Sequence, residues 1–422
     1  MRRITTTPAI TLLYHARMPD SARPTPQQAA FPEFITMMAL TMSLVALAID
    51  AMLPAHGVIG VELGVDDVND TQYIVYTIFA GLGLGQFLFG PLADAIGRKP
   101  ALYAGLAIFV AGTLVSLSAP TYTLLLLGRF LQGIGVAAPR TMTVTIVRDL
   151  FAGRNMARVM SFVISIFILV PAIAPSLGQL MINQFGWRSI FWVFIVLTGL
   201  IVAWFHWRQP ETLAPANRQS LSLHRIGSNM LVVLRTPVAI GYTIAAAAVS
   251  GAFVGFLGTA QQVFAEQYGL GERFPLFFGM LAISIGVSTL INGNVVVRIG
   301  MRALAKGAGV MAVIASLAFF AASVYWSGQP PLAVTMSCMM SLFLFVGFLF
   351  GNLNALAMEP LGHIAGTAAA IIGSVTTLLS AMLGAFSGAL YNGTLAPMAA
   401  SFLMMTVLTV IAIYMTDGYS RA

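Results

Sequence analysis

One aspartate, Asp50, interrupts a long apolar segment that runs from Phe34 to Ile59. Burying a charged carboxylate among apolar groups is costly, so an acid in such a segment faces a cavity or a partner and marks a functional site. A carboxylate in this setting can bind a proton and release it again when its hydration or its neighbours change. Asp50 is therefore the first candidate for chemistry in this chain.

Arg129 is the expected partner of Asp50. It lies in a second apolar segment, roughly 122–147, about two helical turns from the beginning of that segment. If the segments 34–57 and 122–147 cross a membrane in opposite directions, Asp50 and Arg129 reach a similar depth. We expect the two side chains to approach each other and to act as a proton switch. The alternative is a static ion pair that fixes the packing of two helices.

Three polar residues of the second segment are spaced so that they share one helix face: Arg129, Gln132 and Arg140. Gln132 is a candidate for a substrate cavity, with an interhelical hydrogen bond as the alternative. Arg140 is a second candidate for this cavity, where its charge would favour anionic or polarised ligands. Its alternative role is to extend its side chain to the membrane interface.

The composition is that of a polytopic membrane protein. Of the 422 residues, 58% are hydrophobic and 8% are charged, whereas a soluble domain carries about 25% charged residues. The formal net charge of +7 does not indicate binding to nucleic acid, because the basic residues lie in short loops between apolar segments. The single cysteine, Cys338, and the scattered histidines form no metal-binding pattern. We expect neither a metal nor a cofactor.

Twelve apolar segments are long enough to cross a bilayer as helices, which takes about 20 residues. The sequence therefore predicts an all-α membrane protein with twelve transmembrane helices in two six-helix bundles. The predicted helices lie at roughly 34–57, 71–92, 100–119, 122–147, 157–183, 188–207, 237–264, 274–297, 303–326, 331–357, 363–391 and 395–415.

A polar segment rich in proline and serine separates the two predicted bundles at mid-chain. Most lysines and arginines lie in the N-terminal tail, in this segment and in every second loop, which predicts that these parts and both termini are cytoplasmic. The predicted parts are a disordered N-terminal tail (1–33), the first bundle (34–207), a linker (208–236), the second bundle (237–415) and a C-terminal tail (416–422).

Three motifs lie at characteristic places in this arrangement. The loop "GPLADAIGRKP" (90–100) follows the second predicted helix, "GRFLQGIGVAAP" (128–139) lies in the fourth, and "PAIAPSLGQ" (171–179) lies in the fifth. They resemble the signature loop, the fourth-helix motif and the antiporter motif of the major facilitator superfamily. The stretches "VRDLFAGRNMARVMS", "FGWRSIFWV", "AIDAMLPA" and "NALAMEPLGHIAGTAAAIIG" resemble its Bcr/CflA drug-efflux branch.

The resemblance implies roles for further residues. It implies that the first and fourth helices lie side by side at a central cavity, and that Asp94 holds the second bundle in the outward-facing state. We also expect Arg98 to pair with Asp149. Arg140 departs from the family pattern, which has a small or apolar residue there. The residues assigned in this way are Gly90, Asp94, Gly97 and Arg98 in the gating loop, Pro171, Pro175 and Gly178 in the antiporter helix, and Asn354 in the substrate cavity.

These features predict a proton-coupled antiporter that exports small, largely apolar drugs or toxic compounds across the cytoplasmic membrane by alternating access. Its partners are the small-molecule substrate, protons and the lipid bilayer. A monomer suffices because one chain encloses a whole cavity. The presence of one acid within the membrane predicts that one proton is transported per cycle. The alternative is a metabolite transporter of the same fold, working by uniport or symport. An enzyme is not favoured, because the chain has no G-x-S-x-G motif, metal cluster or nucleotide fingerprint.

Overall fold

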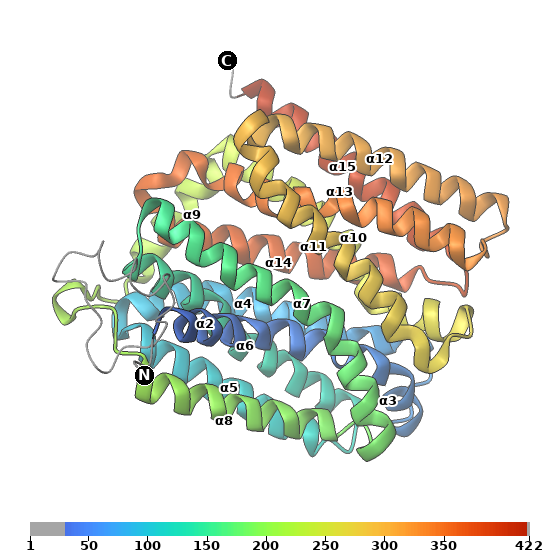
Figure 1. Ribbon diagram of the computed structural model, residues 1–422, viewed down its shortest axis with the longest axis horizontal. Helices are drawn as coiled ribbons and strands as arrows, with labels where there is room; N and C mark the ends of the chain where they lie inside the picture. The colour runs from blue at the N-terminus through green and yellow to red at the C-terminus, as the bar shows by residue number, and fades with distance from the viewer. Residues whose placement is uncertain (1–29, 420–422) are drawn as a thin grey trace, which may run out of the picture.

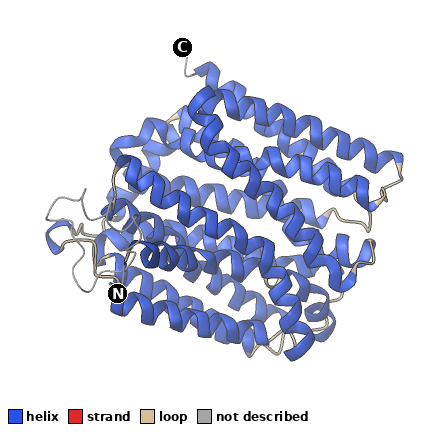
Figure 2. Cartoon of the chain, viewed as in Figure 1, coloured by secondary structure: helices blue, strands red, loops and turns tan. Residues whose placement is uncertain are grey.

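The computed structural model describes residues 30–419, which form helices and connecting loops without any strand (Figure 1, Figure 2). This confirms the predicted all-α fold. A bilayer offers backbone groups no water to bond, so each segment that crosses it satisfies its own N–H and C=O groups as a helix. Residues 1–29, which include most of the predicted N-terminal tail, lie outside the described residues.

Within residues 30–419, twelve long helices form the body of the molecule, as predicted. Eleven helical stretches are long and apolar enough to cross a membrane, and the twelfth long helix, α6, carries Arg129 and Arg140 in its interior. The first six are α2 (Phe31–Asp50), α4 (Tyr73–Ile96), α5 (Arg98–Leu117), α6 (Tyr122–Leu150), α7 (Gly153–Phe185) and α8 (Ser189–Arg208). The last six are α10 (Pro237–Gln261), α11 (Phe274–Ile299), α12 (Met301–Tyr325), α13 (Leu332–Met358), α14 (Ala365–Ala389) and α15 (Ala396–Tyr419).

Shorter elements extend or join these helices. The predicted linker contains the short helix α9, which lies at the same end of the molecule as the beginning of α2, on the left in Figure 1. We call this the linker end, and the end at which α3 lies the opposite end. The short elements are η2 (Leu53–Ala55), α3 (His56–Glu62), η3 (Val68–Gln72), η4 (Pro215–Asn217), α9 (Leu223–Arg235), η5 (Gln262–Gln267), η6 (Gly271–Arg273) and η7 (Glu359–Ile364).

The two six-helix bundles meet along two pairs of helices, α4 with α14 and α7 with α11. Glycines permit the close approach in both pairs. A Cβ atom at Gly83 of α4 would lie 2.7 Å from Cγ of Leu378 in α14, and one at Gly279 of α11 would lie 2.9 Å from the carbonyl oxygen of Ala172 in α7. The two pairs flank the space between the bundles.

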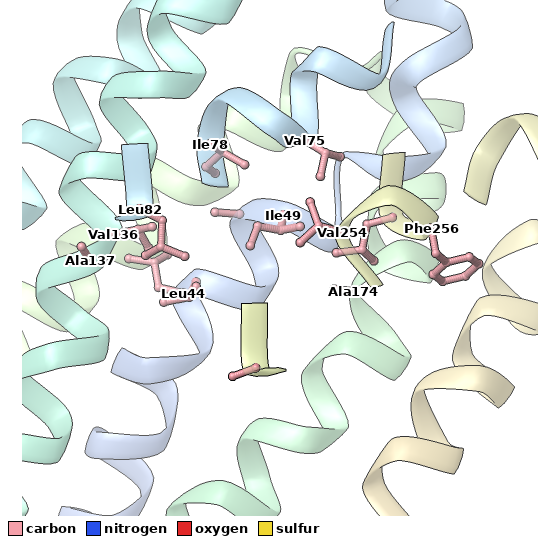
Figure 3. Packing of buried hydrophobic residues seen from close by; sticks show 14 of the residues in the cluster. Leu44, Ile49, Val75, Ile78, Leu82, Val136, Ala137, Ala174, Val254 and Phe256 are labelled. Carbon is pink, nitrogen blue, oxygen red and sulfur yellow. The ribbon is translucent and has the colours of Figure 1, made fainter. Parts of the chain in front are cut away.

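Helix α2 packs against α6, α7 and α8 of the first bundle, and apolar side chains of both bundles gather around its end (Figure 3). Leu44 of α2 packs near Leu82 of α4 and Val136 of α6 in the first bundle. Ile49, farther along α2, shares a cavity wall with Val254 of α10 in the second bundle. All five side chains are at most 6% exposed. The end of α2, where Asp50 lies, is therefore close to both halves.

Helices α4 and α6 come so close that their backbones touch at two glycines. A Cβ atom at Gly81 would lie 3.0 Å from Cα of Gly133, and a Cβ atom at Gly133 would lie 2.9 Å from Cα of Gly81. Small residues at such crossings let membrane helices make close van der Waals contact. This crossing fixes α6, and with it Arg129, against α4.

Replacing Gly133 by alanine should destabilise the protein, because the added methyl group has no room between α4 and α6. Overpacking of this kind costs about 1–3 kcal/mol of unfolding free energy, so the apparent Tm in detergent should fall by several degrees. Gly199→Ala on α8 is the control, since no atom lies within 4 Å of a Cβ added there. A Tm that is the same for both variants would contradict the tight crossing.

Candidate functional site

A central cavity of about 370 Å³ lies between the two bundles. Side chains from α2, α4, α6, α7, α10, α11, α13 and α14 line it. A cavity of this size is suited to a small molecule. Its wall is mostly apolar and strongly aromatic, and its phenylalanines are Phe79, Phe167, Phe253, Phe256, Phe278, Phe343 and Phe350.

Polar groups on the cavity wall are few. Asp50 and Arg140 are its charged residues among the part of the chain that the structure describes, and Asn354 contributes a carboxamide. The structure thus places these three predicted site residues on one wall. The hydroxyl groups on the same wall belong to Ser250, Thr376, Thr377 and Ser380.

The carboxylate of Asp50 lies at the wall without a partner. Asp50 is the last residue of α2 and is 5% exposed. Among the side chains and backbone groups that the structure describes, none gives its carboxylate a hydrogen bond or an ion pair. A charged group in apolar surroundings is costly unless water, a proton or a ligand compensates it. The charge state of Asp50 therefore depends on what the cavity contains.

The side chain of Arg129 is fully buried and held by three acceptors. Its Nη2 donates to the carbonyl oxygen of Ala48 in α2 at 2.9 Å, and its Nε donates to that of Ile74 in α4 at 3.3 Å. Its Nη1 donates to Oε1 of Gln132 at 2.8 Å, and Gln132 donates in turn to Oγ1 of Thr113 in α5 at 2.8 Å. The guanidinium thus joins α2, α4 and α6 in one hydrogen-bonded network.

Arg129 caps the end of α2 that carries Asp50. The N–H group of Met52 donates to the carbonyl oxygen of Ile49 at 3.3 Å, so it does not serve Ala48, four positions before it. Carbonyl groups left open at a helix end take donors from side chains, and Arg129 is the donor to Ala48. The two predicted partners, Arg129 and Asp50, therefore meet the same helix end, but no ion pair joins them in this state.

The position of Gln132 in the structure differs from the predicted one. It is fully buried and is not among the residues that line the cavity. Its amide is occupied by Arg129 and Thr113, which is the interhelical hydrogen bonding given above as the alternative. The prediction that Gln132 contacts substrate is therefore wrong for this state, because α5 and α6 pack over its side chain.

A cluster of amide groups closes the cavity at the opposite end. Nε2 of Gln72 donates to Oε1 of Gln262 at 2.7 Å, which joins the first bundle to the second. Gln262 also donates to Oδ1 of Asn69 at 3.2 Å, and Asn69 donates to the carbonyl oxygen of Tyr391 at 2.8 Å. We call these four residues the amide seal. The sequence does not predict the seal, because it joins Asn69 and Gln72 to residues almost two hundred or more positions away.

Exposed side chains follow α6 from the cavity wall toward the linker end. Arg140 lies on the wall and is exposed. Val144 and Arg148, on the next two turns of the same face of α6, are exposed as well. Because the amide seal is formed and these three side chains are exposed, we interpret the structure as the state in which the cavity is reached from the linker end.

The antiporter-motif residues lie in the interior of α7. Pro171 and Pro175 have no N–H group, so each interrupts the hydrogen bonds of the helix. Pro171 also lines the cavity. A Cβ atom at Gly178 would lie 3.1 Å from Cα of Ala51. Glycine at this position therefore lets α7 pack directly against the break that follows Asp50.

Comparison with known proteins settles the family. Residues 30–385 match the family described as Major Facilitator Superfamily. The chain belongs to the major facilitator superfamily. Its fold agrees with a solved structure of the xylose transporter XylE from E. coli, with a TM-score of 0.68 at 14% sequence identity over 92% of this chain and 97% of the other.

Two relatives of this facilitator bear the names of resistance proteins. The chain is 28% identical over 395 residues to a bicyclomycin resistance protein homolog of Haemophilus influenzae, covering 92% of this chain and 96% of the relative. It is 30% identical over 361 residues to a chloramphenicol resistance protein of Pseudomonas aeruginosa, covering 81% and 82%. The predicted resemblance to the Bcr/CflA branch is thereby confirmed.

The signature loop of the facilitator connects α4 to α5 at the linker end. Nη1 of Arg98 donates to Oδ1 of Asp94 at 2.5 Å, and its Nε donates to Oδ2 of Asp149 at 2.9 Å, which is the expected pairing with Asp149. Gly97 has a φ of +110°, a conformation that favours glycine. A Cβ atom at Gly90 would lie 2.9 Å from an alanine side chain of α14. The loop thus ties α4, α5 and α6 together where α4 meets the second bundle.

Glu211, in the predicted linker, binds the backbone of the same loop. Its Oε1 accepts from the backbone N–H of Arg98 at 2.9 Å, and its Oε2 accepts from that of Lys99 at 3.0 Å. A carboxylate at the N-terminus of α5 satisfies N–H groups that lack helical partners. Burial raises the pKa of Glu211, but the N–H groups of Leu213, Arg98 and Lys99 outweigh it and lower the pKa below its ordinary value.

Glu211→Gln should lower the Tm at neutral pH, because an amide is a weaker acceptor for the two N–H groups than a carboxylate. A lowered pKa in the folded state means that the contribution of Glu211 is complete above its ordinary pKa and is lost as the pH falls through the folded value. The Tm difference between the wild-type protein and the variant should therefore be largest near pH 7 and shrink below about pH 4.3.

The control for this measurement is Glu272→Gln, at an exposed position in η6. Its Tm difference should be small and should not follow the same pH dependence. A Glu211→Gln difference that stays constant or widens as the pH falls would contradict the role given to the Glu211 carboxylate.

Proposed function

We propose that this facilitator is a proton-coupled antiporter that exports small, largely apolar drugs or toxic compounds. The observation that carries the proposal is the unpartnered carboxylate of Asp50 on the wall of an otherwise apolar and aromatic cavity. Such a group can hold a proton or give it up as the cavity fills and empties. The names of the relatives, which describe resistance to bicyclomycin and chloramphenicol, support export as the direction.

The proposed cycle uses the two ends of the cavity in turn. Basic residues concentrate at the linker end, so we place this end and both termini in the cytoplasm, with the protein in the cytoplasmic membrane. Substrate enters from the cytoplasm and Asp50 releases its proton there. The bundles then rock, the amide seal opens, and Asp50 takes up a proton from outside while substrate leaves.

The groups around the end of α2 fit this role for Asp50. The other ionisable side chains there are Arg129, which is tied to backbone carbonyls, and His56, whose ring is buried. Asp50 alone among the three lies on the cavity wall. We therefore assign one proton per cycle to Asp50, and to Arg129 the task of holding the helix end that presents it.

The available free energy is sufficient for export. One proton that moves through about 100 mV gains about 2.3 kcal/mol, and one pH unit adds about 1.4 kcal/mol. Together these sustain a substrate gradient of several hundredfold, on the scale of 1.4 kcal/mol for each factor of ten. A monomer without a cofactor suffices for this cycle, because one chain encloses the cavity.

Asp50→Asn should abolish proton-driven transport while leaving the protein folded, because asparagine has a similar shape but cannot carry the proton. Transport of chloramphenicol and similar neutral drugs would be measured in everted vesicles under an imposed pH gradient. We expect the rate to fall at least tenfold. Asp66→Asn, at an exposed position in the loop at the opposite end, is the control and should transport as the wild-type protein does.

Equal gradient-driven transport by the wild-type protein and Asp50→Asn would contradict the role of Asp50. Wild-type transport that is indifferent to the pH gradient would contradict proton coupling itself and favour uniport. Wild-type transport that reverses direction relative to the proton gradient would favour symport.

A further inference from the structure

Arg140 is the only cation among the described residues that line the cavity. Its side chain is exposed, and no described residue gives it a hydrogen bond or an ion pair. Counting back from Leu150, the last residue of α6, it lies about 15 Å inside the helix end. An arginine close to a helix end can extend to the membrane interface, but Arg140 contributes to the cavity wall instead.

Arg140 and Asp50 carry opposite charges at different levels of the cavity. Arg129 marks the level of the end of α2, because it donates to the carbonyl oxygen of Ala48. Arg140 lies on the same face of α6, about 16 Å nearer the linker end along the helix axis. No described ion pair joins the two wall charges, and a molecule in the cavity lies between their levels.

The wall of the same cavity carries a cluster of aromatic rings from α10 and α13. The ring centroid of Phe253 lies 5.8 Å from that of Phe343 and 5.6 Å from that of Phe350. Phe256 lies 5.0 Å from Phe343 with the rings edge to face. Such rings accept a further aromatic ring in offset-stacked or edge-to-face contact. The cavity thus offers an aromatic surface with one free guanidinium beside it.

We propose that the preferred substrates are aromatic compounds that carry an anionic group such as a carboxylate, and that Arg140 binds this group. This proposal rests on the transport function proposed above and adds the chemical class of the substrate. The planar guanidinium can donate two parallel N–H bonds to a carboxylate.

The charges also fix the orientation of the substrate. Ionised Asp50 repels an anion, so the anionic group lies toward the linker end at Arg140 and the aromatic body lies toward α10 and α13. Each cycle exports one negative charge with the anion and imports one positive charge with the proton. Both movements make the inside of the cell more positive. A membrane potential that is negative inside drives both movements, which makes export of this class more dependent on the potential than export of a neutral drug.

The test compares one aromatic acid with its uncharged ester. Binding of nalidixic acid and of its ethyl ester to the purified protein in detergent would be measured by equilibrium dialysis at pH 7.5. We expect the wild-type protein to bind the acid at least tenfold more tightly than the ester. Arg140→Gln should lose this preference and bind the ester within twofold of wild type. Arg140→Lys, which keeps the charge but not the bidentate geometry, should lie between them.

Arg148→Gln is the matched control, because Arg148 is an exposed arginine on the same helix that does not line the cavity. It should retain the wild-type preference, and unchanged ester binding shows that the Arg140 variants are folded. Equal wild-type affinity for acid and ester, or undiminished acid binding by Arg140→Gln, overturns the proposal. So does a wild-type protein that binds neither compound. Binding in detergent needs no proton gradient, so these outcomes leave antiport of neutral drugs to be judged separately.

Discussion

The break at the end of α2 leaves the carbonyl group of Ala48 to Arg129, and the arrangement of the site depends on this one contact. Met52, which would be the helical donor to Ala48, donates its N–H group to the carbonyl oxygen of Ile49 instead. Arg129 reaches the open carbonyl from α6 and is itself tied to α4. The helix end is thereby fixed in place with Asp50 as its last residue. Because backbone carbonyl groups bind the buried guanidinium of Arg129, the carboxylate of Asp50 remains free to bind a proton.

Arg129 thus carries a permanent charge, while the charge of Asp50 can change. An ion pair between Arg129 and Asp50 would stabilise the carboxylate and oppose its protonation. Because the guanidinium is bonded to carbonyl groups, the content of the cavity decides whether Asp50 is protonated or ionised. Two close helix contacts support the arrangement, Gly133 against α4 and Gly178 against the break itself. At the far side of the break the amide seal closes the cavity by uncharged hydrogen bonds, which can exchange for water when the bundles rock.

Much of this architecture follows from the sequence, because long apolar segments in a membrane have few alternatives to helices. The same reasoning placed Asp50, Arg140 and Asn354 at the cavity from their depth, spacing and motif. The prediction that Gln132 lines the cavity was wrong. Gln132 shares a helix face with Arg140, but it lies where α5 covers α6. The same reasoning also missed Glu211 and the amide seal. These contacts join residues more than a hundred positions apart, and no local pattern encodes which loop meets which helix end.

Proton release on substrate binding tests the central claim most directly. Chloramphenicol, which is neutral, would be added to the purified protein in a weakly buffered solution, and released protons would be counted with a pH indicator between about pH 5 and pH 8. We expect that binding displaces up to one proton per protein at some pH within this range, and that Asp50→Asn releases none while still binding the drug. Equal release by the wild-type protein and Asp50→Asn, or binding without release at every pH, would contradict this claim.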